Sequence, residues 1–302
     1  MFKSKNSMSR ALVRRETTAG YLFLLPSLFF FVTFVLYPMF LCIYTSFFDS
    51  NMGKNAVDVF VGLGNYKELF RDKLFLGALK NTVIIVVVAV PTVCAFSLWV
   101  ATAIYDMKPA LTSAFRCIFY LPVVTGSVAV TVVWKWMYNS RYGVFNYLFK
   151  SLGIIDQNIN WLGDARFALW CIILILFTTS VGQPIVLYVS ALGNVDHSLV
   201  EAAQVDGANR RQVFWKIKWA QIMPTTLYIL IITTINSFQC FALIQLLTSG
   251  GPTHCTDTIM YYIYYTAFKL YRYGYGNAMG VVLMVIIAVL SAVQFKLGQQ
   301  SD

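Results

Sequence analysis

Two histidines are the side chains in this sequence that could act as a general base near neutral pH, because an unperturbed imidazole titrates in that range. They are His197 and His254, and the apolar stretches described below place them on opposite sides of a membrane. A phosphate-cradling loop of the form G-x-x-x-x-G-K-[ST] is absent, and Lys150-Ser151 lacks the glycines that must precede it. The sequence therefore predicts a protein that is not an enzyme and has no ATP site of its own.

The cysteines and the positive charge point to no further chemistry. Five of the six cysteines fall in apolar stretches and Cys255 stands alone in a polar segment, so neither a metal spacing nor a disulfide framework is visible. The net charge is +10, but the basic residues are scattered along the flanks of apolar stretches. This distribution is typical of membrane flanking and argues against a nucleic-acid-binding module.

Polar side chains inside apolar stretches are the remaining candidates, and their chemistry is hydrogen bonding. Several cluster around Gly182 and Pro184, where a helix is expected to be irregular and to expose carbonyl groups. Such side chains either contact a passing solute or bond between helices, and the sequence leaves both roles open for each residue. The candidates for a solute pathway are Thr179, Gln183, Asn236, Ser237, Gln239 and Gln245.

Long apolar stretches must position these side chains. Of 302 residues, 58% are hydrophobic and 12% are charged, which is about half the charged share of a soluble domain. A helix of about 20 apolar residues crosses a hydrocarbon layer of roughly 30 Å. The sequence therefore predicts an all-α membrane protein with six transmembrane helices, at residues 21–48, 79–105, 117–138, 167–192, 225–247 and 275–297.

The amino-terminal segment sets the predicted orientation. It carries five basic residues before an apolar run that is too long for a cleavable signal core, so we expect an uncleaved signal anchor. With six spans both termini lie in the cytoplasm, and the Lys/Arg bias supports this mainly through the amino-terminal tail. The predicted parts are a cytoplasmic tail (1–18), a six-helix domain (19–298) with a cytoplasmic polar loop (193–224), and a carboxyl-terminal tail (299–302).

The segments on the outer side are not simple linkers. Residues 60–82 and 142–170 mix aromatic residues, Gly, Asn and charge, which predicts short amphipathic helices at the outer surface. Residues 249–252 predict a tight turn, and an aromatic run follows it. Such a run is typical of the membrane interface, with stacking on a ligand as the alternative. Gly276 and Gly280 form a small-xxx-small pair suited to close helix contact.

The polar and basic interval from Glu201 to Pro224 predicts two short helices outside the membrane. Ser198 and Glu201 form an S-x-x-E pattern, which predicts a capping box at the start of the first helix. Gly207 can end that helix in the left-handed conformation, and a second helix is predicted to begin near Asn209. The pair is either a docking surface for another protein or two interfacial helices on anionic lipid, and the physics alone favours neither.

The residues of this loop carry a family resemblance. Glu201-Ala202-Ala203, Asp206-Gly207-Ala208, Phe214, Ile217 and Pro224 match the cytoplasmic EAA signature of permease subunits of binding-protein-dependent ABC importers. The chain is most similar to carbohydrate-importer permeases related to the larger maltose-transporter permease and the glycerol-3-phosphate permease. The resemblance covers nearly the whole chain, through FLLPSLFFFVTFVLYP, FVGLGNYKELF, Asn81-Thr82 and LTSGGPTHCTDTIMYYIYYTAF. The chain departs from the family at Ala220, where a proline is usual, and at Ala242, where many members have an acidic residue.

This resemblance implies a type I ABC importer permease (MetI-like) architecture with a cytoplasmic EAA coupling loop. The implied partners are a second homologous permease subunit, two ATP-binding-cassette ATPase subunits that bind ATP and Mg, and an extracellular sugar-binding protein, either a lipoprotein or periplasmic. The chain itself is expected to hold no cofactor and to lie in the lipid bilayer of a bacterial plasma (inner) membrane. The implied coupling residues are Glu201, Ala202, Ala203, Asp206, Gly207, Ala208 and Phe214.

The resemblance implies a sugar or oligosaccharide as the solute, with this chain forming half of the pathway. A phosphorylated polyol or another small solute is the alternative, and the lack of an arginine cluster in the spans favours a neutral sugar. A secondary transporter or channel is a further alternative. It would be expected to carry buried acidic residues or histidine for ion coupling, and no acidic residue lies deep in a predicted span.

Overall fold

The computed structural model describes residues 3–50 and 58–299, with side chains from 16 to 50 and from 58 to 298. The described chain is mostly helical, and its two strands form one short antiparallel pair. The elements of the first half are α1 (Lys3–Phe31), the π-helical segment η1 (Val32–Leu36), α2 (Tyr37–Thr45), β1 (Phe48–Asp49), β2 (Val59–Phe60), α3 (Gly64–Leu69), α4 (Lys73–Tyr105), α5 (Pro109–Val124), α6 (Ser127–Met137) and α7 (Val144–Ser151). Those of the second half are α8 (Ala168–Ser180), α9 (Gly182–Gly193), α10 (His197–Val205), α11 (Arg210–Val213), the π-helical segment η2 (Phe214–Lys218), α12 (Trp219–Phe238), α13 (Ala242–Leu247), α14 (Ile259–Tyr264), the π-helical segment η3 (Tyr265–Lys269) and α15 (Tyr273–Gln299).

Five helical runs of the described chain are long and apolar enough to cross a membrane: Glu16–Thr45, Lys73–Tyr105, Ala168–Gly193, Arg210–Leu247 and Tyr273–Gly298. The predicted span at 117–138 is instead the helix pair α5 and α6, bent by 95°. Pro122 lacks an N–H for the preceding turn, and Gly126 follows the end of α5, so the helix breaks between them. Counted as one span, the bent pair completes the predicted six.

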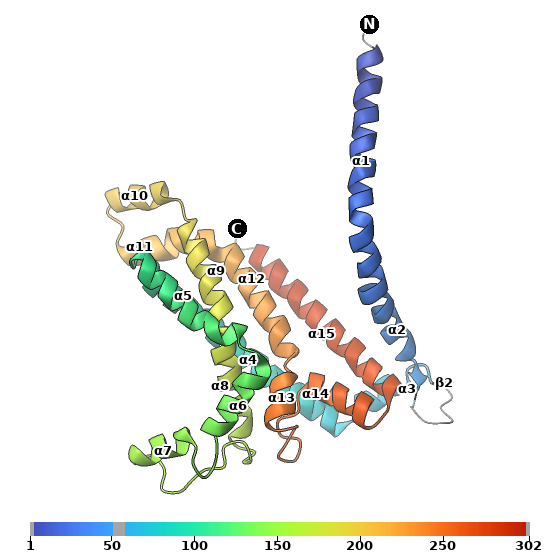
Figure 1. Cartoon of the computed structure of the whole chain (residues 1–302), viewed down its shortest axis with the longest axis vertical. Helices are drawn as coiled ribbons and strands as arrows, with labels where there is room; N and C mark the ends of the chain where they lie inside the picture. Colours follow the sequence, from blue (N-terminus) through green and yellow to red (C-terminus); the bar gives the residue numbers. More distant parts are fainter. Residues whose placement is uncertain (1–2, 51–57, 300–302) are drawn as a thin grey trace.

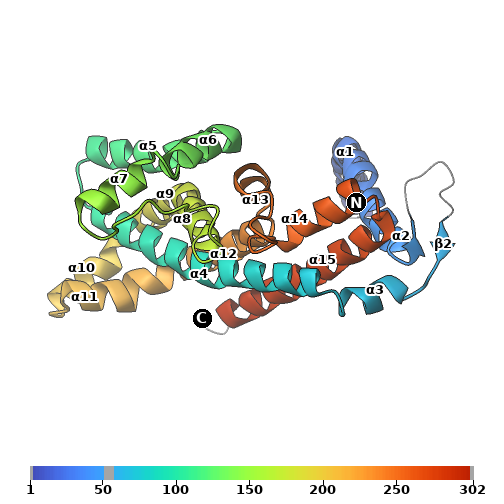
Figure 2. The same ribbon diagram turned by 90° about the horizontal axis from the view of Figure 1, so that it is seen from below.

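The bundle is organised around α4. This helix packs along α9 and α12, and Figure 2 shows it running across the molecule with the others on either side. Its buried face supplies Val93, Val100 and Ala101 to a core shared with Ile185 and Tyr188 of α9. Because α4 touches the helices that carry most of the polar span residues, it fixes their relative positions.

The first span stands apart from this bundle. Figure 1 shows α1 separated from the other helices, and none of the most apolar part of the run Glu16–Thr45 is buried. Contact begins at α2, where a Cβ on Gly280 of α15 would lie 3.8 Å from the Cys42 sulfur. On Gly276 a Cβ would lie 3.0 Å from the Cβ of Ala267. The approach at Gly276 confirms the close contact predicted for the glycine pair, whereas the approach at Gly280 is an ordinary van der Waals contact.

The two ends of the molecule differ in character. The amino end of α1, the carboxyl end of α15 and helix α10 lie toward one end, whereas α7 and the loop after α13 lie at the other (Figure 1). Helices α3 and α7 confirm the short helices predicted in the segments 60–82 and 142–170. Buried Asn146 on α7 holds the segment that follows, because it donates to the Ile159 carbonyl at 2.9 Å and accepts from Trp161 Nε1 at 3.0 Å.

Candidate functional site

Helix α10 begins at His197 and is capped by Asp196. The Asp196 carboxylate accepts the Ser198 hydroxyl at 2.8 Å and the Ser198 N–H at 2.9 Å, and these bonds lower the pKa of Asp196. The predicted capping box of Ser198 and Glu201 is therefore wrong, because Ser198 lies inside the first turn as a donor. Aspartate is as favourable as serine at an N-cap position. Asp196, one residue before the helix, was therefore a usable signal for its start in the sequence.

Gly207 ends α10, as predicted. Its φ is +84°, and the N–H of Ala208 reaches back to the carbonyl of Ala203 at 2.9 Å, which is the pattern of a Schellman motif. Asn209 then begins α11, confirming the predicted start. Its side chain accepts the Gln212 N–H at 2.9 Å while the Gln212 side chain accepts the Asn209 N–H at 2.8 Å, a capping box that the sequence analysis missed. The polar loop is thus two helices with a sharp turn at one glycine.

The predicted coupling residues fall into two groups. On α10 and its turn, Glu201, Ala202, Asp206 and Gly207 are exposed and Ala203 and Ala208 are half-buried. Phe214 lies apart from them, half-buried in η2. No helix end separates this region from the fifth span: α11, η2 and α12 run on continuously, through Ala220 and Pro224. A movement of the loop would therefore be transmitted directly to the helix that carries Asn236.

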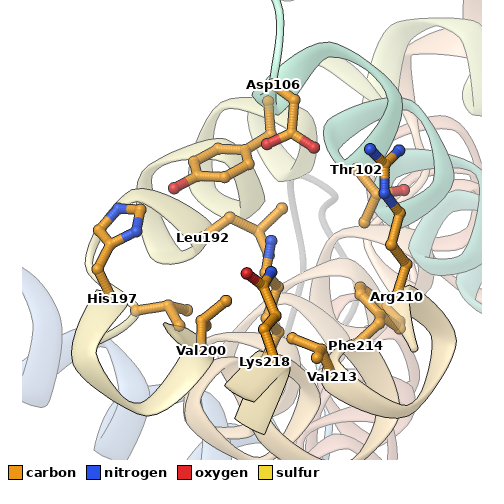
Figure 3. Close-up of a pocket in the computed structure, with 12 residues that line it drawn as sticks. Thr102, Asp106, Leu192, His197, Val200, Arg210, Val213, Phe214 and Lys218 are labelled. Carbon is orange, nitrogen blue, oxygen red and sulfur yellow. The ribbon is translucent and has the colours of Figure 1, made fainter. Parts of the chain in front are cut away.

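A cavity of about 380 Å³ lies behind α10, between the polar loop and the ends of α4 and α9 (Figure 3). The Nζ of Lys218 lies 5.1 Å from the centre of the Tyr105 ring, a cation–π contact that ties η2 to the end of α4. The cavity is lined by Thr102, Tyr105, Asp106, Leu192, Val195, His197, Val200, Gln204, Arg210, Val213, Phe214 and Lys218.

Two further cavities lie within the bundle. The first is about 150 Å³ and opens between α9 and α12, and the second is about 330 Å³ and lies beside the α5–α6 bend. Thr179 and Val123 line both, so the two cavities adjoin. The first is lined by Val123, Thr179, Ser180, Gln183, Pro184, Leu187, Tyr228, Ile229, Ile232, Thr233 and Asn236. The second is lined by Pro122, Val123, Thr125, Ser127, Val130, Leu176, Thr179, Gln239, Cys240, Phe241, Ala242 and Leu243.

The structure brings four of the six predicted pathway residues together. Thr179, Gln183 and Asn236 line the first cavity, and Gln239 joins Thr179 in the second. The other two do not take part: Ser237 is buried beside Asn236, and Gln245 lines neither cavity. Adjacent helical residues differ by about 100° in direction, which is why Ser237 points into the core while Asn236 faces the cavity.

Two aromatic residues complete the lining, and the sequence analysis missed both. Tyr228 lies in the first cavity and is 50% exposed, and Phe241 lies in the second. Tyr228 precedes Asn236 by about two helical turns, so the two share a face of α12. That spacing was a usable signal in the sequence.

A break between α8 and α9 shapes the first cavity and confirms the predicted irregularity. Pro184 cannot donate to the carbonyl of Ser180, and the two helices meet at Val181. The buried hydroxyl of Ser97 on α4 donates to the Val181 carbonyl at 3.2 Å. Beside it, Gly182 lets α5 approach so closely that a Cβ there would overlap the Phe119 carbonyl oxygen.

Comparison with known proteins identifies the family. Residues 61–299 match the family described as the binding-protein-dependent transport system inner membrane component. The chain belongs to this family. It is 32% identical to the lactose transport system permease protein LacF of Rhizobium radiobacter over 288 residues, covering 94% of this chain and 95% of that protein. It is 31% identical to the multiple sugar-binding transport system permease protein MsmF of Streptococcus mutans, covering 94% and 96%.

A solved structure confirms the fold. The chain superposes with a TM-score of 0.80 and 24% identity on a chain of a bacterial alginate ABC transporter in complex with an alginate pentasaccharide-bound periplasmic protein, covering 93% of each. This likeness confirms the predicted six-span, MetI-like permease architecture. By its family and its curated relatives, the permease is a transport component of the membrane rather than an enzyme.

The loop between α13 and α14 is held by a polar cluster. Residues 249–252 form the predicted turn, in which Gly250 has a φ of +83° and the N–H of Gly251 bonds to the Thr248 carbonyl at 2.9 Å. Burial raises the pKa of Asp257, which accepts Nδ1 of His254 at 2.7 Å. His254 therefore lies hydrogen-bonded to Asp257 in this loop, while His197 lines the cavity behind α10.

Proposed function

We propose that this permease forms one half of the pathway of an ATP-driven importer for a sugar or oligosaccharide. The observation that carries the proposal is the lining of the two adjoining cavities. Carboxamides and a hydroxyl from Gln183, Asn236, Gln239 and Thr179 can donate to and accept from sugar hydroxyl groups. Tyr228 offers an aromatic face for the apolar side of a sugar ring. The lactose and multiple-sugar systems to which LacF and MsmF belong support the same class of solute.

The charge of the cavities supports a neutral solute over a phosphorylated polyol. Neither lining contains Arg or Lys, the side chains that bind phosphate groups most strongly. An anionic solute would leave its charge uncompensated there. A secondary transporter or channel is less well supported, because neither lining contains Asp, Glu or His for coupling to an ion.

A second homologous permease would complete the pathway. The cavity beside the bend is walled by α5 and α6, and these helices present a row of exposed apolar side chains. A surface of this kind suits contact with another helical subunit. The row comprises Ile118, Leu121, Val124, Val128 and Val132, each more than 60% exposed.

Two ATP-binding-cassette ATPase subunits, which would bind ATP and Mg, are the proposed cytoplasmic partners, one docking on this polar loop and the other on the loop of the second permease. The exposed Ala202 and Val205 leave a surface that another protein can approach closely, and Val205 is 88% exposed. The coupling residues would be Glu201, Ala202, Ala203, Asp206, Gly207, Ala208 and Phe214. This assignment puts the loop and both termini in the cytoplasm of a bacterium, with the permease in its inner membrane and the sugar-binding protein on the outer side.

Co-purification from native membranes, with identification of the partners by mass spectrometry, tests the proposal. We expect an ATPase, a second permease with its own EAA loop and an extracellular solute-binding protein. The sugar that remains bound to that last protein would identify the cargo. Recovery of the intact chain alone under gentle conditions would overturn the importer assignment, and interfacial helices on lipid would then explain the polar loop.

A further inference from the structure

The cavity behind α10 carries positive charge that the proposed sugar pathway does not use. Arg210 and Lys218 enter it from α11 and η2, and Asp106 faces them from the end of α4 (Figure 3). Among the described residues the ion pairs involve other side chains, so neither cation has a carboxylate within 4.0 Å. The two cations and the one carboxylate of the lining leave one net positive charge in the cavity.

An exposed tryptophan, packed on a half-buried one, places this cavity near the membrane interface. The membrane-crossing run that contains η2 begins at Arg210. Trp215 on η2 is 54% exposed, and its ring centre lies 5.5 Å from that of Trp219. Tryptophans in this setting are typical of the lipid headgroup region. The cavity also has an apolar floor, because Leu192 and Val213 are buried there.

We propose that this cavity binds the phosphodiester headgroup of an anionic phospholipid. A phosphodiester carries one negative charge, which matches the net charge of the cavity. Guanidinium and ammonium groups are the usual phosphate ligands, and basic pockets on the cytoplasmic side of membrane proteins bind anionic headgroups. The contact of Lys218 with Tyr105 holds the ammonium group at the cavity wall.

On α10 the lipid site and the proposed ATPase surface use different faces, and the one coupling residue that lines the cavity, Phe214, lies outside α10 in η2. His197, Val200 and Gln204 follow a spacing of three and four residues and line the cavity. Ala202 lies about half a turn away from them and is exposed on the opposite side. A headgroup can therefore occupy the cavity while a protein covers α10. The bound headgroup would stabilise the position of the polar loop relative to α4.

A pair of charge-matched variants tests the site in the full-length chain. Arg210→Gln with Lys218→Gln removes the cavity cations, whereas Arg211→Gln with Lys216→Gln removes two exposed neighbours that do not line it. Each chain is placed in nanodiscs of phosphatidylcholine, and in an equal mixture of phosphatidylcholine and phosphatidylglycerol. Retained lipid is counted by native mass spectrometry, with and without added inorganic phosphate. The wild type and the neighbour variant should retain phosphatidylglycerol preferentially, and the cavity variant should lose the preference.

Each other result overturns the proposal in a distinct way. Equal loss in both double variants would indicate diffuse surface attraction, and retention in the cavity variant would place the lipid elsewhere. Displacement by inorganic phosphate would identify a free anion as the ligand. Loss of binding to a co-purified ATPase, with the lipid preference intact, would assign the cavity to that protein.

Asp106→Asn tests whether misfolding, rather than loss of the lipid site, explains the result for the cavity variant. This change keeps both cations and removes the one carboxylate, so the net positive charge of the cavity rises. We expect phosphatidylglycerol retention to increase relative to the wild type, a gain that misfolding would not produce. An unchanged or lower retention would contradict the site.

Discussion

Asn81 and Asp257 lie 176 positions apart in the chain, and Nδ2 of Asn81 donates to the backbone carbonyl of Asp257 at 3.0 Å. The same nitrogen donates to the Cys255 carbonyl at 3.0 Å, and the neighbouring Thr82 hydroxyl accepts the N–H of Ile259 at 3.0 Å. The start of α4 thus holds the loop that leads to the last span. Asn81-Thr82 and the segment LTSGGPTHCTDTIMYYIYYTAF, which carry the family resemblance in sequence, are therefore joined in the structure.

We expect Asn81→Ala to loosen this loop. It leaves two carbonyl groups without their donor, at a cost of about 1–3 kcal/mol. Cys255 should then react faster with a membrane-impermeant maleimide added from the outer side. Lys80→Ala changes an exposed neighbour and should leave the rate unchanged, and Cys255→Ser should abolish the signal. Equal labelling rates in Asn81→Ala and wild type would show that the loop is held by other contacts.

Gly207→Pro should uncouple transport from ATP hydrolysis while leaving membrane insertion intact. Proline fixes φ near −65°, whereas Gly207 has a φ of +84°, so α10 cannot keep its orientation on α11. The measurements are uptake and ATPase activity of the assembled transporter. Gly153→Pro imposes the same conflict at a φ of +68° after α7 and should not uncouple. Normal uptake by a well-expressed Gly207→Pro chain would remove the coupling assignment.

Periodic and local signals predicted most of this structure. Hydropathy located the spans, and the glycine at 207 located the turn of the polar loop because a left-handed φ there strongly favours glycine. The 95° bend between α5 and α6 was not predicted, since hydropathy reports burial in lipid and carries no direction. The cap at Asp196 was missed because two patterns competed within three residues, and only tertiary structure shows which one forms.

The cavities show the same limit. Composition identified polar residues within spans, but it could not tell Asn236 from Ser237, because the facing direction depends on how α12 packs against α4 and α9. The cavity that contains Lys218 was not predicted at all. It is formed by the ends of helices that lie far apart in sequence, and no local pattern reports such a meeting.

Gln183→Ala combined with Asn236→Ala should lower uptake more than it lowers complex assembly. Both side chains are exposed to the first cavity, so their loss removes hydrogen bonds to the solute without opening the core. Uptake of labelled sugar and the yield of purified complex are compared. Ser237→Ala is the matched control, because this buried residue lies outside both cavities. A parallel fall in uptake and assembly would indicate a packing role.

Gly182→Ala should destabilise the permease by about 1–3 kcal/mol, because the added methyl group meets the backbone of α5 at Phe119. Gly193→Ala is expected to have no cost or to stabilise, since its Cβ would meet nothing within 4 Å. Thermal unfolding of the two variants in detergent compares them directly. Equal unfolding midpoints for the two variants would show that α5 can shift away from α9. The close approach of the two helices would then not be required for stability.

Asp72→Asn should change how the stability of the permease depends on pH in the acid range. Asp72 Oδ2 accepts the hydroxyls of Tyr262 at 2.7 Å and Tyr275 at 2.9 Å, and Oδ1 accepts the Leu74 N–H at 2.8 Å. Burial alone would raise the pKa of Asp72, but these donors together lower it below the ordinary value of 3.8. The carboxylate therefore stabilises the folded state above pH 3.8, and this contribution is lost as the pH falls through the folded pKa.

Asparagine can still cap the N-terminus of α4 but carries no charge. The difference in stability between wild type and variant therefore measures the contribution of the ionised carboxylate. The unfolding midpoint of the variant should lie below that of the wild type by a constant amount from neutral pH to about pH 4, and the gap should close below it. Asp156→Asn changes an exposed carboxylate on the same side and should show no gap. A gap that persisted undiminished at the lowest pH would mean that the shape of the side chain, rather than its charge, holds Tyr262 and Tyr275 together.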